Sequence, residues 1–348
     1  MKGKTFQAMA NRVFNDIREI KQFPKNAEFN VVGVLLRITR RRDRNENPFW
    51  EMTIGDASGD MEGKAWYNAS WFNNQGGDKF PIDPDNCGFT LDGLTIGING
   101  TIVDYKGQPQ YTFNEIHILD QVKYPPQKYT RRSPLKQEFL ESTFKNLIAE
   151  ISYKPLQDFI NAVFFKHNLW EKYKVWPAAI SIHHAYAAGL LEHSISVAIG
   201  ARDMAKHYDE FLIPVNKDIL IAGALLHDIG KIMAYNNIPV PQPRPEGSVI
   251  EHVSLGYGMF IKFAAAENLD KDLQTAIAHV ILSHHGRFEY GSPVLPETPE
   301  AMLVSAADEI DFQLNYWKTQ IEGLGEQNQV TEYLPMLERR LWKGIPPK

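Results

Sequence analysis

The chain has 348 residues, which exceeds one typical domain and is enough for two hydrophobic cores. Its formal net charge of −5 excludes a protein that is basic overall, so any contact with nucleic acid requires a local basic patch. The single cysteine, Cys87, excludes an intramolecular disulfide framework, and the sequence contains neither a signal-peptide pattern nor an apolar run long enough to span a bilayer. We therefore expect a cytoplasmic protein without a membrane partner.

Five strand-like segments follow one another between residues 26 and 122. They are short, rich in valine, isoleucine, threonine and aromatic residues, and separated by Gly, Asn and Asp: FNVVGVLLRIT, FWEMTIGD, GDMEGKAWYN, LTIGINGTIVDY and QPQYTFNEIHIL. We expect these segments to form a small antiparallel β-barrel, preceded by a helical extension over residues 1–25.

The pattern changes after the barrel. Residues 123–135 contain the prolines and basic residues of KYPPQKYTRRSP, which predict an exposed linker. From 136 to 348 the apolar spacing is helical, as in LKQEFLESTFKNLIAEI, DILIAGALLHDIGKIM and DLQTAIAHVILSHH. The sequence therefore predicts a multidomain α and β protein in which an all-α bundle follows the barrel.

The stretch LLHDIGKI places three reactive side chains among aliphatic residues. On a helix, positions three or four apart face the same side, so His227, Asp228 and Lys231 would converge on one patch. Burying a carboxylate is costly unless a cation neutralises it, which makes a metal ion a natural partner for Asp228. The alternative is that His227 and Asp228 only cap a helix or form hydrogen bonds inside a bundle.

Histidines and acids of the same character recur through the helical half. They are His193 in HHAYAAGLLEHSISVA, His252 in EGSVIEHVSLG, His284 and His285 in LSHHGRFEYGSP, and Asp308 in SAADEIDFQL. Several of these imidazoles are embedded in apolar helices, where a solvated histidine is not expected, and shared metal ligation explains their placement. Imidazole and carboxylate ligands suit Mn, Fe, Co, Ni or Zn, and fit Mg or Ca poorly.

These motifs carry a resemblance to a known family. The order His193, then His227 and Asp228, then Asp308 resembles the HD-domain metal-dependent phosphohydrolases, and the added histidines resemble the subset that holds two metal ions. The similarity is closer still to the YhaM-type 3′-to-5′ exoribonucleases, in which an OB-fold domain precedes an HD domain. It runs from the barrel to about Leu314. It implies an N-terminal five-stranded OB-fold barrel over 26–122 and an HD domain over 136–348.

The resemblance also implies a metal centre and a homo-oligomer. One divalent transition-metal ion would bind His193, His227, Asp228 and Asp308, and a second would bind His252, His284 and His285, with Asp228 bridging both. Manganese is the first candidate, with cobalt, iron and nickel as alternatives. Asp228 and Lys231 would be catalytic, because paired cations activate water for in-line attack and a lysine can donate to a phosphate oxygen. Alternatively, Lys231 is a solvated surface residue.

Two further residues are candidates for contact with the substrate. His184, with its neighbour His183, lies too far along the chain from His193 to share its metal but could line a substrate channel, and Arg287 could meet a phosphate. Capping, packing or a surface position are the alternatives for these residues. Glu192 and Asp311 are candidates for orienting ligand imidazoles.

The barrel contains a basic segment next to aromatic residues. RITRRRDRNENPFW places Arg40, Arg41, Arg42 and Arg44 beside Phe49 and Trp50, and GKAWYNASWF adds Lys64 and Trp66. OB folds grip single strands through cationic and stacking aromatic side chains, so this segment is predicted to bind single-stranded RNA or DNA. The alternative is that the aromatic residues, Trp50 and Trp66 among them, fill the barrel while the arginines are solvated.

The predictions converge on a metal-dependent 3′-to-5′ exonuclease that hydrolyses single-stranded RNA, or DNA, to nucleoside 5′-monophosphates. One alternative is an HD phosphodiesterase or phosphatase that acts on a cyclic or short signalling nucleotide, with the barrel serving assembly. The other alternative is a non-catalytic nucleic-acid-binding protein whose HD site is structural or regulatory.

Overall fold

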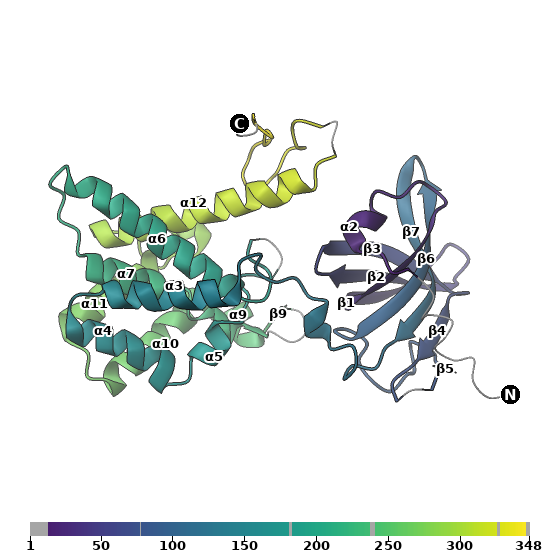
Figure 1. Cartoon of the computed structure of the whole chain (residues 1–348), viewed down its shortest axis with the longest axis horizontal. Helices are drawn as coiled ribbons and strands as arrows, with labels where there is room; N and C mark the ends of the chain where they lie inside the picture. The colour runs from purple at the N-terminus through teal and green to yellow at the C-terminus, as the bar shows by residue number, and fades with distance from the viewer. Residues whose placement is uncertain (1–12, 77, 181–182, 237–240, 326–327, 346–348) are drawn as a thin grey trace. The chain divides into compact units, whose positions relative to one another are not determined.

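The computed structural model describes residues 13–76, 78–180, 183–236, 241–325 and 328–345. The chain divides into two compact units, the first ending at Arg132 and the second beginning at Ser133 (Figure 1). This division falls inside the segment 123–135 that the sequence predicts to be a linker.

The first unit is a closed barrel of five strands. They are β1 (Glu28–Arg42), β2 (Pro48–Asp56), β3 (Gly59–Trp66), β6 (Thr95–Tyr105) and β7 (Gln108–Ile118). Neighbours in the order β3-β2-β1-β6-β7 are antiparallel, and a parallel pairing of β3 with β7 closes the barrel. The predicted five-stranded OB-type barrel is therefore confirmed.

Two short strands lengthen the sheet beyond the five predicted ones. β4 (Ser70–Asn73) pairs in parallel with β7, and β5 (Phe80–Pro81) pairs with β4. The single turn of 3-10 helix at Pro126–Lys128 follows the barrel.

Period-two alternation fills the barrel interior. Along β3, Met61 and Ala65 are buried while Asp60 and Glu62 are exposed. Glycine is required where aromatic rings cross the strands: a Cβ added at Gly63 would lie 2.3 Å from the Phe113 ring. The outer faces of β2 and β3 are therefore free to carry polar side chains.

Residues 1–12 of the predicted helical extension lie outside the described residues. α2 (Ile17–Ile20) begins after Asp16, whose side chain accepts a hydrogen bond of 2.8 Å from the Glu19 N–H. Ile17 and Ile20 are buried in the barrel core. The short helix is therefore part of the barrel unit.

The second unit is a helical bundle, as predicted. Its helices are α3 (Gln137–Glu150), α4 (Lys154–Asn161), α5 (Trp170–Tyr173), α6 (Gly189–Asp209), α7 (Lys217–Leu226), α8 (Lys231–Ala234), α9 (Pro245–Val249), α10 (His252–Ala266), α11 (Lys271–Ser283) and α12 (Pro299–Glu322). α6, α7, α11 and α12 pack against one another around an aliphatic core. The predicted metal ligands lie on α6, α10 and α12, in the turn after α7 and directly after the end of α11.

Small non-α elements interrupt the bundle. β8 (Tyr235–Asn236) and β9 (Gln242–Pro243) pair as a two-stranded ribbon, so the expectation of an all-α domain is corrected to that extent. Ala162–Lys166 is a π-helical turn and Phe288–Tyr290 a 3-10 turn. Within the part of the chain that the structure describes, no helix has the length and apolar character needed to cross a bilayer.

Candidate metal centre and barrel surface

The HDIG segment breaks the helix that the sequence predicts to be continuous. α7 ends at Leu226 and α8 begins at Lys231, with a turn over residues 227–230 between them. Gly230 is needed at this turn, because a Cβ there would lie 1.9 Å from the carbonyl oxygen of His252. The glycine lets the start of α10 approach the turn directly, and this contact brings His252 close to Asp228.

One group of ligand atoms lies where α6, the α7–α8 turn and α12 meet. The Nε2 atoms of His193 and His227 are 3.2 Å apart, and each lies 3.3 Å from Oδ2 of Asp228. Oδ1 of Asp308 lies 3.1 Å from Nε2 of His193 and 4.0 Å from Nε2 of His227. The structure therefore brings together the four residues predicted to hold the first metal ion.

A second group faces the other oxygen of the same carboxylate. Oδ1 of Asp228 lies 3.3 Å from Nε2 of His252 and 3.6 Å from Nε2 of His284. Nε2 of His285 lies 3.3 Å from Nε2 of His252. The two oxygens of Asp228 thus point at different groups, as a bridging ligand requires.

Buried atoms without partners mark the centre of this arrangement. Oδ1 of Asp228 and Nε2 of His284 are buried and accept or donate no hydrogen bond, although buried polar atoms are almost always paired. Burial raises the pKa of Asp228, but Lys231 and His227 outweigh burial and hold it well below its ordinary value. Burial also lowers the pKa of His284, so its imidazole is neutral. The ionised Asp228 carboxylate and the neutral His284 imidazole are donors that suit a transition metal.

The environment of His193 also favours a positive charge. Burial lowers the pKa of its imidazole, but the carboxylates of Asp228, Asp308 and Asp311 raise that pKa well above its ordinary value. Acidic groups converging on one buried point stabilise a cation there, whether a proton or a metal ion.

Each predicted histidine ligand is oriented by a hydrogen bond from its other ring nitrogen. The Nδ1 partners are Asp311 for His193 (2.7 Å), the Ala224 carbonyl for His227 (2.7 Å), Glu251 for His252 (2.5 Å), the Ile281 carbonyl for His284 (2.7 Å) and the Tyr290 carbonyl for His285 (2.5 Å). Carbonyl and carboxylate oxygens only accept, so Nδ1 carries the proton in every case. The Nε2 atoms are therefore the available ligands.

A buried polar network contacts His193 at Nδ1, the ring nitrogen that faces away from the other predicted ligands. Oδ2 of Asp311 accepts hydrogen bonds from Nδ1 of His193 and from Nε2 of His184 (3.0 Å). Nδ1 of His184 lies 2.7 Å from the hydroxyl of Tyr186, which donates to Glu192 (3.0 Å). Both ring nitrogens of His184 are thus occupied by protein groups, and this placement favours support of the metal ligand over the predicted contact with substrate.

The other predicted residues differ in position. Lys231 is 5% exposed, and its Nζ lies 2.5 Å from Oδ2 of Asp228, so it belongs to the centre and not to the surface. Arg287 is exposed, with its guanidinium 5.5 Å from the centroid of the Tyr290 ring. His183 lies beside His193, and burial lowers its pKa to about 3, which leaves it neutral.

Two supporting residues escaped the sequence reasoning. Glu251 accepts from His252 and also caps α10 by accepting from the Val253 N–H (3.0 Å). An acid immediately before the first histidine of a helix is the signal that could have identified it. Tyr186 contacts His184 two residues earlier in the chain, and only the folded loop shows that its hydroxyl joins His184 to Glu192.

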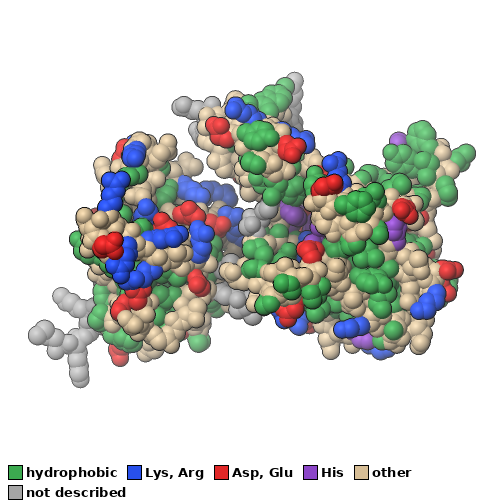
Figure 2. Space-filling model, turned by 180° about the vertical axis from the view of Figure 1, so that it is seen from behind, with side chains coloured by type: hydrophobic (Ala, Val, Ile, Leu, Met, Phe, Trp, Pro, Cys, Tyr) green, Lys and Arg blue, Asp and Glu red, His purple; other side chains and the backbone are tan. Residues whose placement is uncertain are grey.

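On the barrel, the predicted strand-binding residues separate into two faces. Figure 2 shows Lys and Arg side chains crowded on one face of the barrel unit, with Asp and Glu among them. Arg41 on β1 pairs with Phe49 on β2, which pairs with Trp66 on β3, so alternation puts all three on one side of the sheet. Nζ of Lys64 lies 5.3 Å from the Phe49 ring centroid and 5.7 Å from that of Trp66.

The neighbours of Arg41 and Phe49 on β1 and β2 are Arg40 and Trp50, and these two residues face the opposite side of the sheet. Trp50 lies in the barrel core beside Trp71, and its indole N–H donates to Asp85 (3.1 Å). Arg40 pairs with the same Asp85 at 2.7 Å. Trp50 is therefore removed from the predicted stacking residues, because it faces the barrel core. Phe49 is buried to the same degree, at 8% exposed, but it lies on the outer side of the sheet against Trp66 and Lys64.

The remaining arginines have carboxylate partners or lie in the turn. Arg41 lies 3.2 Å from Glu51, and Arg42 lies 3.2 Å from Glu46. These pairs are exposed, so they contribute at most about 1 kcal/mol each and a phosphate can displace the carboxylate. Arg44 is exposed in the turn between β1 and β2.

Comparisons with known proteins agree with this architecture. Residues 190–313 match the HD domain family. Over 316 residues the chain is 27% identical to the 3′-5′ exoribonuclease YhaM of Oceanobacillus iheyensis, a match that covers 90% of this chain and 92% of that protein. The predicted resemblance is thereby confirmed.

Solved structures give weaker matches. The second OB-fold domain of replication protein A from Methanococcus maripaludis is 13% identical with a TM-score of 0.20, covering 30% of this chain and 94% of that one. Aspartyl tRNA synthetase from Entamoeba histolytica is 9% identical with a TM-score of 0.24, covering 79% of this chain and 60% of that one. TM-scores this low support no further conclusion.

Proposed function

Because its second unit contains an HD domain and the chain resembles YhaM-type exoribonucleases, we propose that this protein is a metal-dependent 3′-to-5′ exonuclease. Its substrate would be single-stranded RNA or DNA, and its products nucleoside 5′-monophosphates. The observation that carries the proposal is the position of Asp228, whose two oxygens face separate groups of imidazole nitrogens.

The residues present fit two divalent transition-metal ions, with manganese as the first candidate. The first ion would be held by His193, His227, Asp228 and Asp308, and the second by Asp228, His252, His284 and His285. Support comes from the unpartnered Oδ1 of Asp228 and Nε2 of His284, which a cation would satisfy. It also comes from the five Nδ1 hydrogen bonds, which orient the ligands before a metal binds.

When bound, such a pair of cations supplies a water of lowered pKa and neutralises charge on the phosphate during in-line displacement. The chain's own residues position this chemistry. Asp228 lies in the turn between α7 and α8, and its two carboxylate oxygens face the two groups of ligands. The Lys231 ammonium has three donors, so it can remain paired with Asp228 and still donate to a phosphate oxygen. Burial lowers the pKa of Lys231, but Asp228 outweighs burial and raises it, which keeps the ammonium charged.

The outer face of the barrel would capture the strand. Arg41 and Lys64 would supply cations for the phosphate backbone, and Trp66, which packs on the buried Phe49 ring in a tilted arrangement with centroids 5.0 Å apart, would supply an aromatic surface for a base. These backbone and stacking contacts do not depend on base identity, so they alone would hold any single strand. The homo-oligomer implied by the resemblance belongs to the same proposal, and light scattering of the purified chain tests it.

Product analysis on end-labelled single strands tests the proposed reaction. With manganese, a 5′-labelled RNA should shorten one nucleotide at a time, and a 3′-labelled RNA should release labelled monophosphate at once. The Asp228→Asn variant, matched in shape but uncharged, should do neither. A mobility shift without cleavage would favour the non-catalytic alternative, and cleavage inside the strand would contradict an exonuclease.

A further inference from the structure

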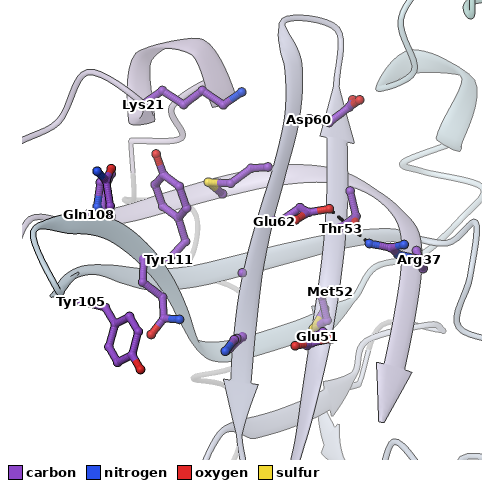
Figure 3. Close-up of a pocket in the computed structure, with 15 residues that line it drawn as sticks. Lys21, Arg37, Glu51, Met52, Thr53, Asp60, Glu62, Tyr105, Gln108 and Tyr111 are labelled. Carbon is purple, nitrogen blue, oxygen red and sulfur yellow. Dashed lines mark hydrogen bonds and ion pairs between the residues drawn. The ribbon is translucent and has the colours of Figure 1, made fainter. Parts of the chain in front are cut away.

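A polar pocket of about 560 Å³ opens on the barrel between β2, β3 and the β6–β7 hairpin (Figure 3). Its lining contains three cationic and three acidic side chains: Lys21, Arg37, Lys64, Glu51, Asp60 and Glu62. The charges balance, whereas a site for a phosphate group needs an excess of cationic donors. The pocket is therefore built for a neutral ligand that has both hydrogen-bond donors and acceptors.

The uncharged part of the lining suits a flat ligand. Figure 3 shows Tyr105 and Tyr111 on the hairpin side of the pocket, with Glu62, Thr53 and Arg37 on the strand side. Tyrosine rings offer faces for stacking. Burial raises the pKa of Tyr111, so its phenol stays neutral. An aromatic wall opposite a polar wall matches a nucleobase, which has an apolar face and a polar edge.

We propose that this pocket binds one base of the strand and prefers guanine. The inference rests on the proposed function, since it assumes a single-stranded nucleic acid as ligand. Guanine has two adjacent N–H donors, at N1 and N2, which match the two oxygens of one carboxylate, and it has acceptors at O6 and N7 for a cationic side chain. Uracil has one N–H between two carbonyl oxygens, and a carboxylate repels those oxygens.

Glu62 and Arg37 are the side chains placed to form hydrogen bonds with N1, N2 and O6 of guanine. They lie 3.2 Å apart on neighbouring strands, with the Arg37 side chain 67% exposed and the Glu62 side chain 76% exposed. An exposed ion pair contributes little to folding, so it can open without cost to the barrel. Glu62 would accept from N1 and N2 of guanine while Arg37 donates to O6.

Binding to matched strands tests the inference in the full-length protein. Fluorescence anisotropy in the presence of a metal chelator, which prevents hydrolysis, compares a labelled oligouridine with the same strand carrying one guanosine. The wild type should bind the guanosine strand about tenfold more tightly, the size expected for one bidentate contact. Glu62→Gln should remove that difference without weakening the oligouridine complex. Glu28→Gln, an exposed carboxylate at the start of β1, should keep it.

Equal affinity of the wild type for the two strands would overturn the inference, and so would a Glu62→Gln variant that weakens both complexes alike. Hydrolysis of the oligouridine with added manganese is measured on the same preparations. Failure of the exonuclease proposal leaves that strand intact while the guanosine preference persists. Failure of the pocket inference leaves hydrolysis present and the preference absent.

Discussion

Replacing Asp311 with asparagine should weaken binding of the first metal ion and leave binding of the second unchanged. Asp311 lies on α12 and contacts no atom of the second group, but its Oδ2 accepts from Nδ1 of His193 (2.7 Å) and from Nε2 of His184 (3.0 Å). Asparagine keeps the shape of the side chain and removes its charge. Among the predicted metal ligands, the perturbation therefore acts on the orientation and basicity of His193, and it also removes the charged partner of His184.

The expected magnitude follows from these two contacts. A hydrogen bond to a charged acceptor contributes about 1.5–3 kcal/mol, and the amide oxygen of asparagine retains only a neutral bond. Mutating the partner of a metal-ligating histidine typically weakens metal affinity by about 10- to 100-fold, or about 1.4–2.8 kcal/mol, and the difference between the charged and the neutral bond lies at the lower end of this range. The second site should keep its affinity for the metal ion. The Nδ1 atoms of its ligands His252, His284 and His285 donate to groups other than Asp311.

The assay is manganese content per chain after dialysis against graded chelator concentrations. Asp311→Asn should lose one ion at a roughly tenfold to hundredfold lower chelator strength than the wild type and lose the other at the same strength. Glu322→Gln, an exposed carboxylate at the end of the same helix, serves as the matched control. Thermal unfolding of the metal-free proteins checks that folding is retained. Release of both ions together, or of neither, would refute independent support of the first site.

Three further outcomes are expected. His252→Ala should retain one ion and lose most of its activity, measured by elemental analysis and nuclease assay, and two retained ions would contradict the assignment. Gly230→Ala should prevent the second ion from binding, because the added Cβ would lie 1.9 Å from the His252 carbonyl oxygen; unaltered metal content would show that α10 can shift. Changing Arg41 and Lys64 to alanine should lower the log-log salt slope of RNA binding by about 0.7 per phosphate contact. Arg40→Ala, whose partner is Asp85, should leave that slope unchanged, and an equal effect of both changes would argue against a specific face.

Local patterns predicted the barrel because each strand carries its own alternation. The five long strands were visible for this reason, whereas β4 escaped prediction. Its four residues, Ser70–Asn73, are too few to show a period, and they are held by parallel pairing with β7, which lies far away in sequence. Pairing between segments that are distant in sequence cannot be predicted from the residues of one short segment.

The metal centre was predicted from residue types, but its geometry was not. The apolar spacing does not mark the helix break after Leu226, because Ile229 continues that spacing and the break depends on contact between Gly230 and α10. In the arginine-rich segment, the sheet separates residues that are adjacent in sequence. Neighbouring residues such as Arg40 and Arg41 point to different faces of the sheet, so closeness in sequence does not make one binding surface.

The central claim is that Asp228 bridges two metal ions, and anomalous diffraction from crystals grown with manganese tests it most directly. Two peaks are predicted on either side of the Asp228 carboxylate. One should lie among His193, His227 and Asp308, and the other among His252, His284 and His285. A single peak, or two peaks of which neither contacts Asp228, would contradict the account.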